Sequence, residues 1–203
     1  MTVLNNLLIT QGNIFLAPGC YFHSEFNGVG YKDFPPILQR KHNQQLIQQY
    51  ALPLPNEKTP LLPKVLSEHW ALLPEVALGL GILLHAEPLP WWVELSKYRV
   101  LHTRLSRPLW QSENQPTTSP QVLTALGVQQ LLMCLAPFGT AYTLRAKYMF
   151  SLETQQLIPS SVKTMLPWNT IEETCRYVQL YRLTVDDGTM KALGDSIPMR
   201  SEE

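Results

Sequence analysis

Histidine is the residue type in this chain best suited to bind a metal or move a proton, and the spacing of the five histidines argues against a metal site. No two of them follow the H-E-x-x-H arrangement or another compact ligand spacing. Those within apolar stretches have the surroundings of hydrogen-bonded core histidines. The five are His23, His42, His69, His85 and His102. We therefore expect no metal site among them.

The other motifs that suggest chemistry are short and incomplete. Gly28-Val29-Gly30 and Gly79-Leu80-Gly81 do not extend to G-x-G-x-x-G, and neither follows a clear strand. No G-x-S-x-G elbow is present. Cys134 lies in an apolar helical stripe, where burial would raise the pKa of its thiol and make it a poor nucleophile. We expect a non-enzymatic protein with no catalytic residues and no cofactor. The alternative is a small helical enzyme whose pocket is lined by His69, His85 and nearby acids.

A local cluster of basic residues follows two adjacent tryptophans. Lys97, Arg99, His102, Arg104 and Arg107 come within eleven positions, after Trp91 and Trp92. One interpretation is a solvated helix face. The other is a docking site for an acidic partner, since Trp and Arg dominate interface hot spots. The candidate partner-binding residues are Trp91, Trp92, Arg99, Arg104 and Arg107.

Composition limits the classes of partner. The formal net charge is zero, whereas nucleic-acid binders usually carry a basic excess, so nucleic acid is disfavoured. Charged residues make up 16% of the chain, below the usual level of about 25%. Either a partner covers part of the surface, or uncharged polar residues replace the missing charges.

Cysteine usage and hydropathy predict a soluble cytosolic protein. Cys20, Cys134 and Cys175 are odd in number and widely spaced, which fits a reducing compartment. The N-terminus lacks the basic region and long apolar core of a signal peptide. The apolar run Val76–Leu84 has nine residues, whereas a membrane span needs about 20. We expect no direct membrane insertion.

Hydrophobic periodicity predicts helices throughout most of the chain. Two apolar blocks, Leu66–Glu87 and Ala125–Ser151, are typical of buried helices. Residues 91–105 predict a further helix. Gly79 and Gly81 are tolerable there only if a neighbouring helix packs closely. The other expected boundaries are a helix start at Pro35 and Pro36, an extended loop through Pro53, Pro55, Pro60 and Pro63, an N-cap at Ser119, a break at Pro137, and a T-x-x-E capping box at Thr170 and Glu173.

The predicted fold class is mainly α. We expect a single irregular multi-helix domain of about six to eight helices over residues 1–185. The glycines and prolines of the first 30 residues predict an irregular N-terminal segment. Residues 186–203 are expected to form a polar, flexible C-terminal tail.

Three segments together resemble a known family. Phe15 to His23 is similar to an early F-x-P-x-x-Y-x-H element, which places Pro18, Tyr21 and His23 in a structural motif, with one extra residue before the proline. The block from Trp70 to Glu87 is similar in its Leu-Pro-x-Val-Ala centre. The block from Ala125 to Ser151 shares a pattern around Gly127, Pro137 and Arg145. In this order the segments resemble the SctK family of type III secretion systems, also called OrgA, MxiK or YscK.

The resemblance implies an adaptor without catalytic residues. Members of that family link the cytoplasmic domain of the inner-membrane ring protein SctD to the sorting-platform protein SctQ, and through it to SctL and the export ATPase. The protein would be cytoplasmic and peripherally associated with the inner membrane through the injectisome. Tyr21 and His23 would order the N-terminal segment against the body. A third reading, a secretion chaperone, is disfavoured because such chaperones are usually smaller, acidic dimers.

Overall fold

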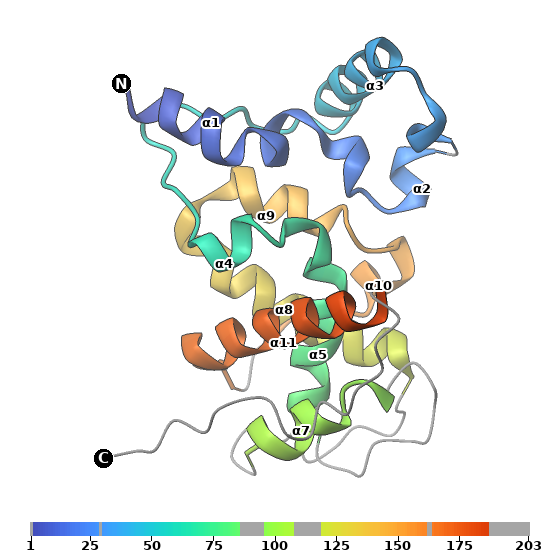
Figure 1. The fold of residues 1–203 in the computed structure, drawn as a ribbon, viewed down its shortest axis with the longest axis vertical. Helices are drawn as coiled ribbons and strands as arrows, with labels where there is room; N and C mark the ends of the chain where they lie inside the picture. The colour runs from blue at the N-terminus through green and yellow to red at the C-terminus, as the bar shows by residue number, and fades with distance from the viewer. Residues whose placement is uncertain (1, 29, 86–95, 108–118, 162–163, 187–203) are drawn as a thin grey trace.

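The computed structural model describes residues 2–28, 30–85, 96–107, 119–161 and 164–186. This part of the chain is built from α-helices and short 3-10 turns, and it contains no strand (Figure 1). The mainly α prediction is confirmed. The α-helices are α1 (Val3–Leu16), α2 (Ser24–Asn27), α3 (Pro36–Gln49), α4 (Lys64–Ser67), α5 (Leu73–Leu83), α7 (Arg99–Leu105), α8 (Pro120–Leu135), α9 (Thr140–Lys147), α10 (Leu152–Gln156) and α11 (Trp168–Asp186). The 3-10 turns are η1 (Pro18–Cys20), η2 (Tyr31–Asp33), η3 (Trp70–Leu72) and η5 (Ala136–Phe138).

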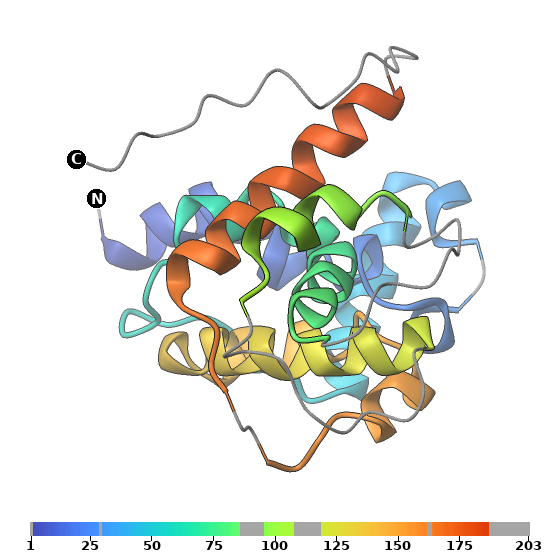
Figure 2. The ribbon, with the colours of Figure 1, turned by 90° about the horizontal axis from the view of Figure 1, so that it is seen from below.

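Helix α5 is the centre of the molecule and lies between α8 on one side and α7 with α11 on the other (Figure 2). Its apolar sequence is buried on nearly every face, as expected. Pro74 stands in its first turn, where a proline lacks only a donor that the helix leaves free.

Glycines allow the two faces of α5 to be approached closely. A Cβ on Gly81 would lie 1.7 Å from the carbonyl oxygen of Leu123 in α8, and a Cβ on Gly127 would lie 1.6 Å from that of Ala77. On the opposite face, a Cβ on Gly79 would lie 2.9 Å from the Thr174 side chain in α11. The expected close packing at Gly79 and Gly81 is confirmed, and its partners are α8 and α11.

Side-chain and proline signals mark several helix boundaries where they were expected. The Ser119 hydroxyl accepts a hydrogen bond from the Val122 amide and caps α8. Pro137 lies in the 3-10 turn that separates α8 from α9. Polar Gln130, inside the apolar stripe of α8, uses its amide to bind the Thr164 carbonyl and the Leu166 amide. Its burial therefore leaves no unpaired amide.

The prediction of an irregular N-terminal segment is wrong for its first half, whereas the described residues between 17 and 35 form only short turns and the four-residue helix α2. Residues 3–16 form α1, which is capped by the Thr2 hydroxyl and buries Leu7, Ile14 and Phe15 against the body. Gly12 suggested a break, but a glycine inside a helix costs only about 1 kcal/mol. Burial of three large apolar side chains outweighs that cost.

Two other boundaries differ from the prediction. Helix α11 begins at Trp168, so the predicted cap residue Thr170 is buried in its first turn. There, its carbonyl accepts a hydrogen bond from the Thr174 hydroxyl. Of the predicted helix over 91–105, Ser96 is helical, a turn follows at Lys97 and Tyr98, and α7 then runs from Arg99 to Leu105. Residues 91–95 and the expected tail beyond Asp186 lie outside the described residues.

Among the described residues, one helix has the length and the apolar composition that a membrane-spanning helix needs. It is the segment Pro120–Phe138, with a mean hydropathy of 1.4. Its apolar window is 56% buried inside the molecule. A core helix meets the same criterion, and α8 packs as one between α5 and the segment around Thr164.

Candidate interaction surface

The basic cluster lies at the end of the molecule opposite α1 and α3 (Figure 1). Arg99 and Arg104 belong to α7, and Arg107 follows it directly. Arg104 and Arg107 are exposed, whereas Arg99 is half-buried and engaged in a contact of its own. Trp91 and Trp92 lie outside the described residues. The structure therefore places two of the five candidate residues on open surface.

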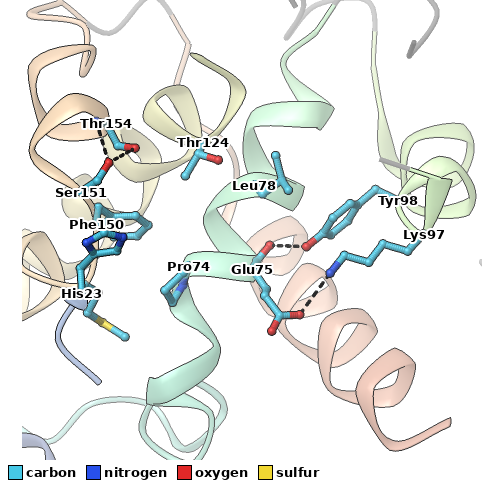
Figure 3. A pocket seen from close by; sticks show the side chains of 11 residues that line it. His23, Pro74, Glu75, Leu78, Lys97, Tyr98, Thr124, Phe150, Ser151 and Thr154 are labelled. Carbon is cyan, nitrogen blue, oxygen red and sulfur yellow. Dashed lines mark hydrogen bonds and ion pairs between the residues drawn. The ribbon is translucent and has the colours of Figure 1, made fainter. Parts of the chain in front are cut away.

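Glu75 compensates two of the neighbouring positive charges. Its carboxylate oxygens lie 3.4 Å from the Lys97 ammonium and 3.3 Å from the Arg182 guanidinium (Figure 3 shows the first pair). Arg176 pairs in the same way with Glu172, at 2.6 Å. Within the described part of the chain, Arg104 and Arg107 form no ion pair. Among the described residues of this end, the cationic side chains without an ion pair therefore include Arg104 of α7 and Arg107 just beyond it.

Tyrosine hydroxyls fix the segment before α7 to its neighbours. Tyr98 is buried and donates to the Glu75 carbonyl at 2.9 Å, and Tyr177 of α11 donates to the Lys97 carbonyl. Burial raises the pKa of Tyr98, and the negative charge of Glu75 adds to the shift. Burial also raises the pKa of Tyr177, while the nearby Arg104 charge lowers it. Both phenols stay neutral donors, so these hydrogen bonds join the segment before α7 to α5 and α11.

The other end of α7 is fixed through the end of α5. The His102 ring lies 3.3 Å from the His85 carbonyl, and the Ser106 hydroxyl donates to the Leu83 carbonyl at 3.2 Å. These contacts satisfy carbonyls that the last turn of a helix leaves free. His102 thus has a structural partner, although it belongs to the basic cluster.

A groove of about 260 Å³ lies beside the Glu75–Lys97 pair (Figure 3). Leu78 and Phe150 are among the apolar side chains that line it, and His23, Ser151 and Thr154 are among the polar ones. The Ser151 hydroxyl accepts from the Thr154 amide at 3.1 Å and lies 3.0 Å from the Thr154 hydroxyl. Ser151 is therefore used as the cap of α10. The groove has a mainly apolar lining with polar side chains beside it, so it suits an apolar side chain.

The enzyme alternative placed His69 and His85 in one pocket. In the described part of the chain His85 is buried at the end of α5, and neither histidine lines the groove beside Glu75 or the smaller hollow at Tyr177. In the same part of the chain, no three His, Cys, Asp or Glu side chains are grouped closely enough to hold a metal ion. Burial raises the pKa of the Cys134 thiol to about 11, as expected for its apolar stripe.

The motif of Pro18, Tyr21 and His23 connects the N-terminal helices to the body. The Tyr21 hydroxyl donates to the Ile14 carbonyl, and its ring lies edge-on to Trp70 with centroids 6.0 Å apart. The His23 amide donates to the Tyr148 carbonyl at 2.9 Å. Pro18 is buried, and its carbonyl accepts from the Tyr21 and Phe22 amides.

Sequence reasoning missed a buried polar network at the same junction. Arg145 is fully buried and donates to the carbonyls of Pro53, Ala141 and Phe15 at 2.7, 2.9 and 3.2 Å. No described carboxylate pairs with it. Burial lowers the pKa of Arg145, and the nearby Tyr21 hydroxyl opposes that shift. The signal available in the sequence was an arginine between the apolar residues Leu144 and Ala146.

Gln11 and Tyr142 extend this network to the proline loop. The Gln11 amide binds both the carbonyl and the amide of Leu62, at 2.9 and 3.1 Å. The Tyr142 hydroxyl lies 3.0 Å from Gln11 and donates to the Pro60 carbonyl at 2.8 Å. Segments 11–15, 53–62 and 141–145 are thereby joined, which sets the position of the N-terminal helices relative to the body.

Comparison with known proteins returned no match: no family model, no curated protein and no solved structure is detectably similar to this chain.

Proposed function

We propose that this protein is a non-enzymatic adaptor of a type III secretion injectisome. It would link the cytoplasmic domain of the ring protein SctD to the platform protein SctQ, and through SctQ to SctL and the export ATPase. It would act in the cytoplasm, peripherally associated with the inner membrane through the injectisome, without a cofactor. In this way it would support effector secretion.

The observation that carries the proposal is the resemblance of three segments, in order along the chain, to the SctK family. Tyr21 of the first segment packs against Trp70 at the start of the second. The second and third segments cross at Gly81 and Gly127, where their backbones touch. Apolar segments of one domain pack together in any case, so the proposal rests on the sequence pattern.

A second observation supports a docking role. The molecule has positively charged side chains on the surface at α7, with Arg104 and Arg107 exposed and without a described carboxylate partner. An adaptor needs such a surface for one of its two partners, and charge complementarity would favour an acidic one. We assign Arg99, Arg104 and Arg107, with Trp91 and Trp92, to this contact.

The test is a binding measurement with the purified full chain against SctQ and against the cytoplasmic domain of SctD. The native chain should bind both. The double variant Arg104→Glu/Arg107→Glu should weaken binding to one of them by roughly tenfold or more and flatten its salt dependence.

The matched control is Arg40→Glu/Lys41→Glu, which changes the net charge equally on exposed residues of α3 at the opposite end. It should leave that affinity unchanged. If neither protein binds the native chain, the adaptor proposal is wrong. If both bind but the two double variants behave alike, the adaptor stands and the assignment of the contact to α7 is wrong.

A further inference from the structure

Helix α3 lies at the edge of the molecule and contributes little to its core (Figure 1). Two of its fourteen residues are buried, Asn43 and Leu46, whereas eight of the eleven residues of α5 are buried. On its outer side, Ile37 is 76% exposed. Most of the stability of a helix in a protein comes from packing of its apolar face. Helix α3 is therefore held by much less packing than the central helices.

The apolar contacts of α3 belong to a small cluster beside the main core. Leu46 packs there with Phe22 and Leu52, and the half-buried rings of Tyr50 and Tyr148 pack against them. The Tyr148 ring lies 5.2 Å from the Phe22 ring and 4.5 Å from the Tyr50 ring, between centroids. The buried residues of this cluster are distinct from those of the main core. Loss of the cluster would therefore leave the packing of α5 against α8 intact.

The polar contacts of α3 join it to the segment that precedes it. Asn43 accepts a hydrogen bond from the Gly19 amide at 2.8 Å and donates one to the Tyr31 hydroxyl at 3.0 Å. The His42 ring lies 2.9 Å from the Asn27 side chain. These partners lie in η1, α2 and η2. The contacts can break without a change in α5, α8 or α11.

The two ends of α3 have the properties of joints. Before the helix, Pro35 is exposed and extended, with φ −55° and ψ 151°. After the helix, Ala51 has a φ of +46° and is the one non-glycine residue with positive φ in the described part of the chain. A Cβ is strained in this left-handed region, and such strain is found at switch regions. Just beyond Ala51, Arg145 holds the Pro53 carbonyl in place.

We propose that α3 is a lid that opens as a unit, turning at Pro35 and Ala51, while the rest of the chain stays folded. Opening removes Leu46 and Tyr50 from the small cluster and uncovers the rings of Phe22 and Tyr148. It also relieves the strain at Ala51. The lid lies at the end of the molecule opposite α7 (Figure 1). The inference concerns a single chain and does not rest on the adaptor proposal.

Native-state hydrogen exchange of the purified full chain, measured by NMR at increasing low concentrations of urea, tests the proposal. Amides of α3 should be protected at least about 100-fold less than those of α5 and α8. Their exchange should depend weakly on urea, because opening of the lid exposes little surface, whereas exchange of the core amides should rise steeply. Equal protection and equal urea dependence of α3 and α5 would overturn the proposal.

Two substitutions should change the opening of the lid in opposite directions. Leu46→Ala should speed exchange in α3 by roughly 30-fold or more, because it removes buried contacts of the closed lid. Ala51→Gly should slow it by roughly fivefold, because glycine takes a positive φ without strain. The matched control is Ile37→Ala, an exposed position of the same helix, which should change exchange by less than about threefold. Equal effects of Leu46→Ala and Ile37→Ala, or faster exchange in Ala51→Gly, would contradict the proposal.

Gly81→Ala separates opening of the lid from unfolding of the whole chain. The added Cβ overpacks the α5–α8 crossing, so exchange of the core amides should speed up. Exchange in α3 should stay within about twofold of the native rate, because the open and the closed lid carry the same altered core. Equal acceleration in α3 and in the core would show that α3 opens only when the core unfolds, and would overturn the proposal. The urea series on the native chain gives the same distinction without this variant.

Discussion

Arg145 shows how one polar residue determines the arrangement of several segments. A buried charge is costly unless it is hydrogen-bonded, and this guanidinium meets three carbonyl oxygens instead of a carboxylate. Its planar fork suits this role, because its donors point in fixed directions toward separate segments. The Phe15 ring, 5.2 Å away, adds a cation–π contact. Arg145 therefore joins α1, α9 and the proline loop.

Arg145→Ala should destabilise the protein by about 3 kcal/mol, because it leaves buried carbonyls unpaired and opens a cavity. Arg145→Lys should also destabilise it, since an ammonium cannot reach all three acceptors with the same geometry. Urea unfolding followed by circular dichroism measures both effects. The exposed residue Arg104 provides the control, and Arg104→Ala should change stability by no more than about 0.5 kcal/mol. Equal effects of the two alanine variants would contradict the role given to Arg145.

At the level of elements, the α5–α8 crossing holds the core together. The backbones of the two helices touch at Gly81 and Gly127. A Cβ on Gly81 would overlap the Leu123 carbonyl, and a Cβ on Gly127 would overlap the Ala77 carbonyl. Backbone cannot move aside as the end of a flexible side chain can. This contact therefore tolerates no residue larger than glycine without separating the helices.

Gly81→Ala and Gly127→Ala should each destabilise the protein by about 3 kcal/mol, at the upper end of overpacking costs. Thermal or urea unfolding would measure the loss. Gly12→Ala is the control on a third helix, where the new methyl group meets open space and should stabilise the protein. The argument would be refuted if all three alanine variants shifted stability in the same direction and by similar amounts.

At the level of the whole molecule, two buried thiols and a buried phenol determine how its stability changes at alkaline pH. Burial raises the pKa of Cys134 to about 11, and that of Cys175 and Tyr142 to about 12. Their ordinary values are 9.0 for the thiols and 10.0 for the phenol. Above pH 9 the unfolded chain releases these protons first, so the folded state binds more protons and stability falls as the pH rises.

We therefore expect full stability below about pH 9 and a progressive loss, on the order of a few kcal/mol, by about pH 11. Thermal midpoints measured across this range test the expectation. The double variant Cys134→Ala/Cys175→Ala should be less stable near neutral pH, because it loses packing, but should show a shallower decline in alkali. A native chain with constant stability from pH 8 to pH 11 would disprove the burial of these groups.

Much of the helical architecture was readable from short-range signals. Ser119 marked the start of α8, Pro35 and Pro36 marked the start of α3, and Pro137 separated α8 from α9. These signals work because a cap or a missing amide acts within one turn of the helix. The same local logic failed for Gly12 and for Thr170, where packing against distant segments outweighed the local preference.

The candidate site was only partly predictable. The sequence indicated that the basic residues near α7 are close together, but not that Glu75 would compensate Lys97 while Arg104 and Arg107 stay exposed. Ion pairing depends on which side chains meet across helices, and Glu75 and Lys97 are 22 positions apart. The same reason explains why the role of Arg145 was missed, since its acceptors lie up to 130 positions away.

Composition and periodicity by themselves established a helical protein of neutral net charge, because they depend on average properties and on neighbours within a turn. Tertiary structure alone decided which glycines serve packing. Gly81 and Gly127 meet a backbone from another helix, whereas Gly12 meets open space, although all three look alike in the sequence. Tertiary structure also decided which charged side chains form ion pairs, such as Lys97 with Glu75. Both outcomes follow from contacts between segments far apart in the chain, and such contacts exist only after the helices have packed.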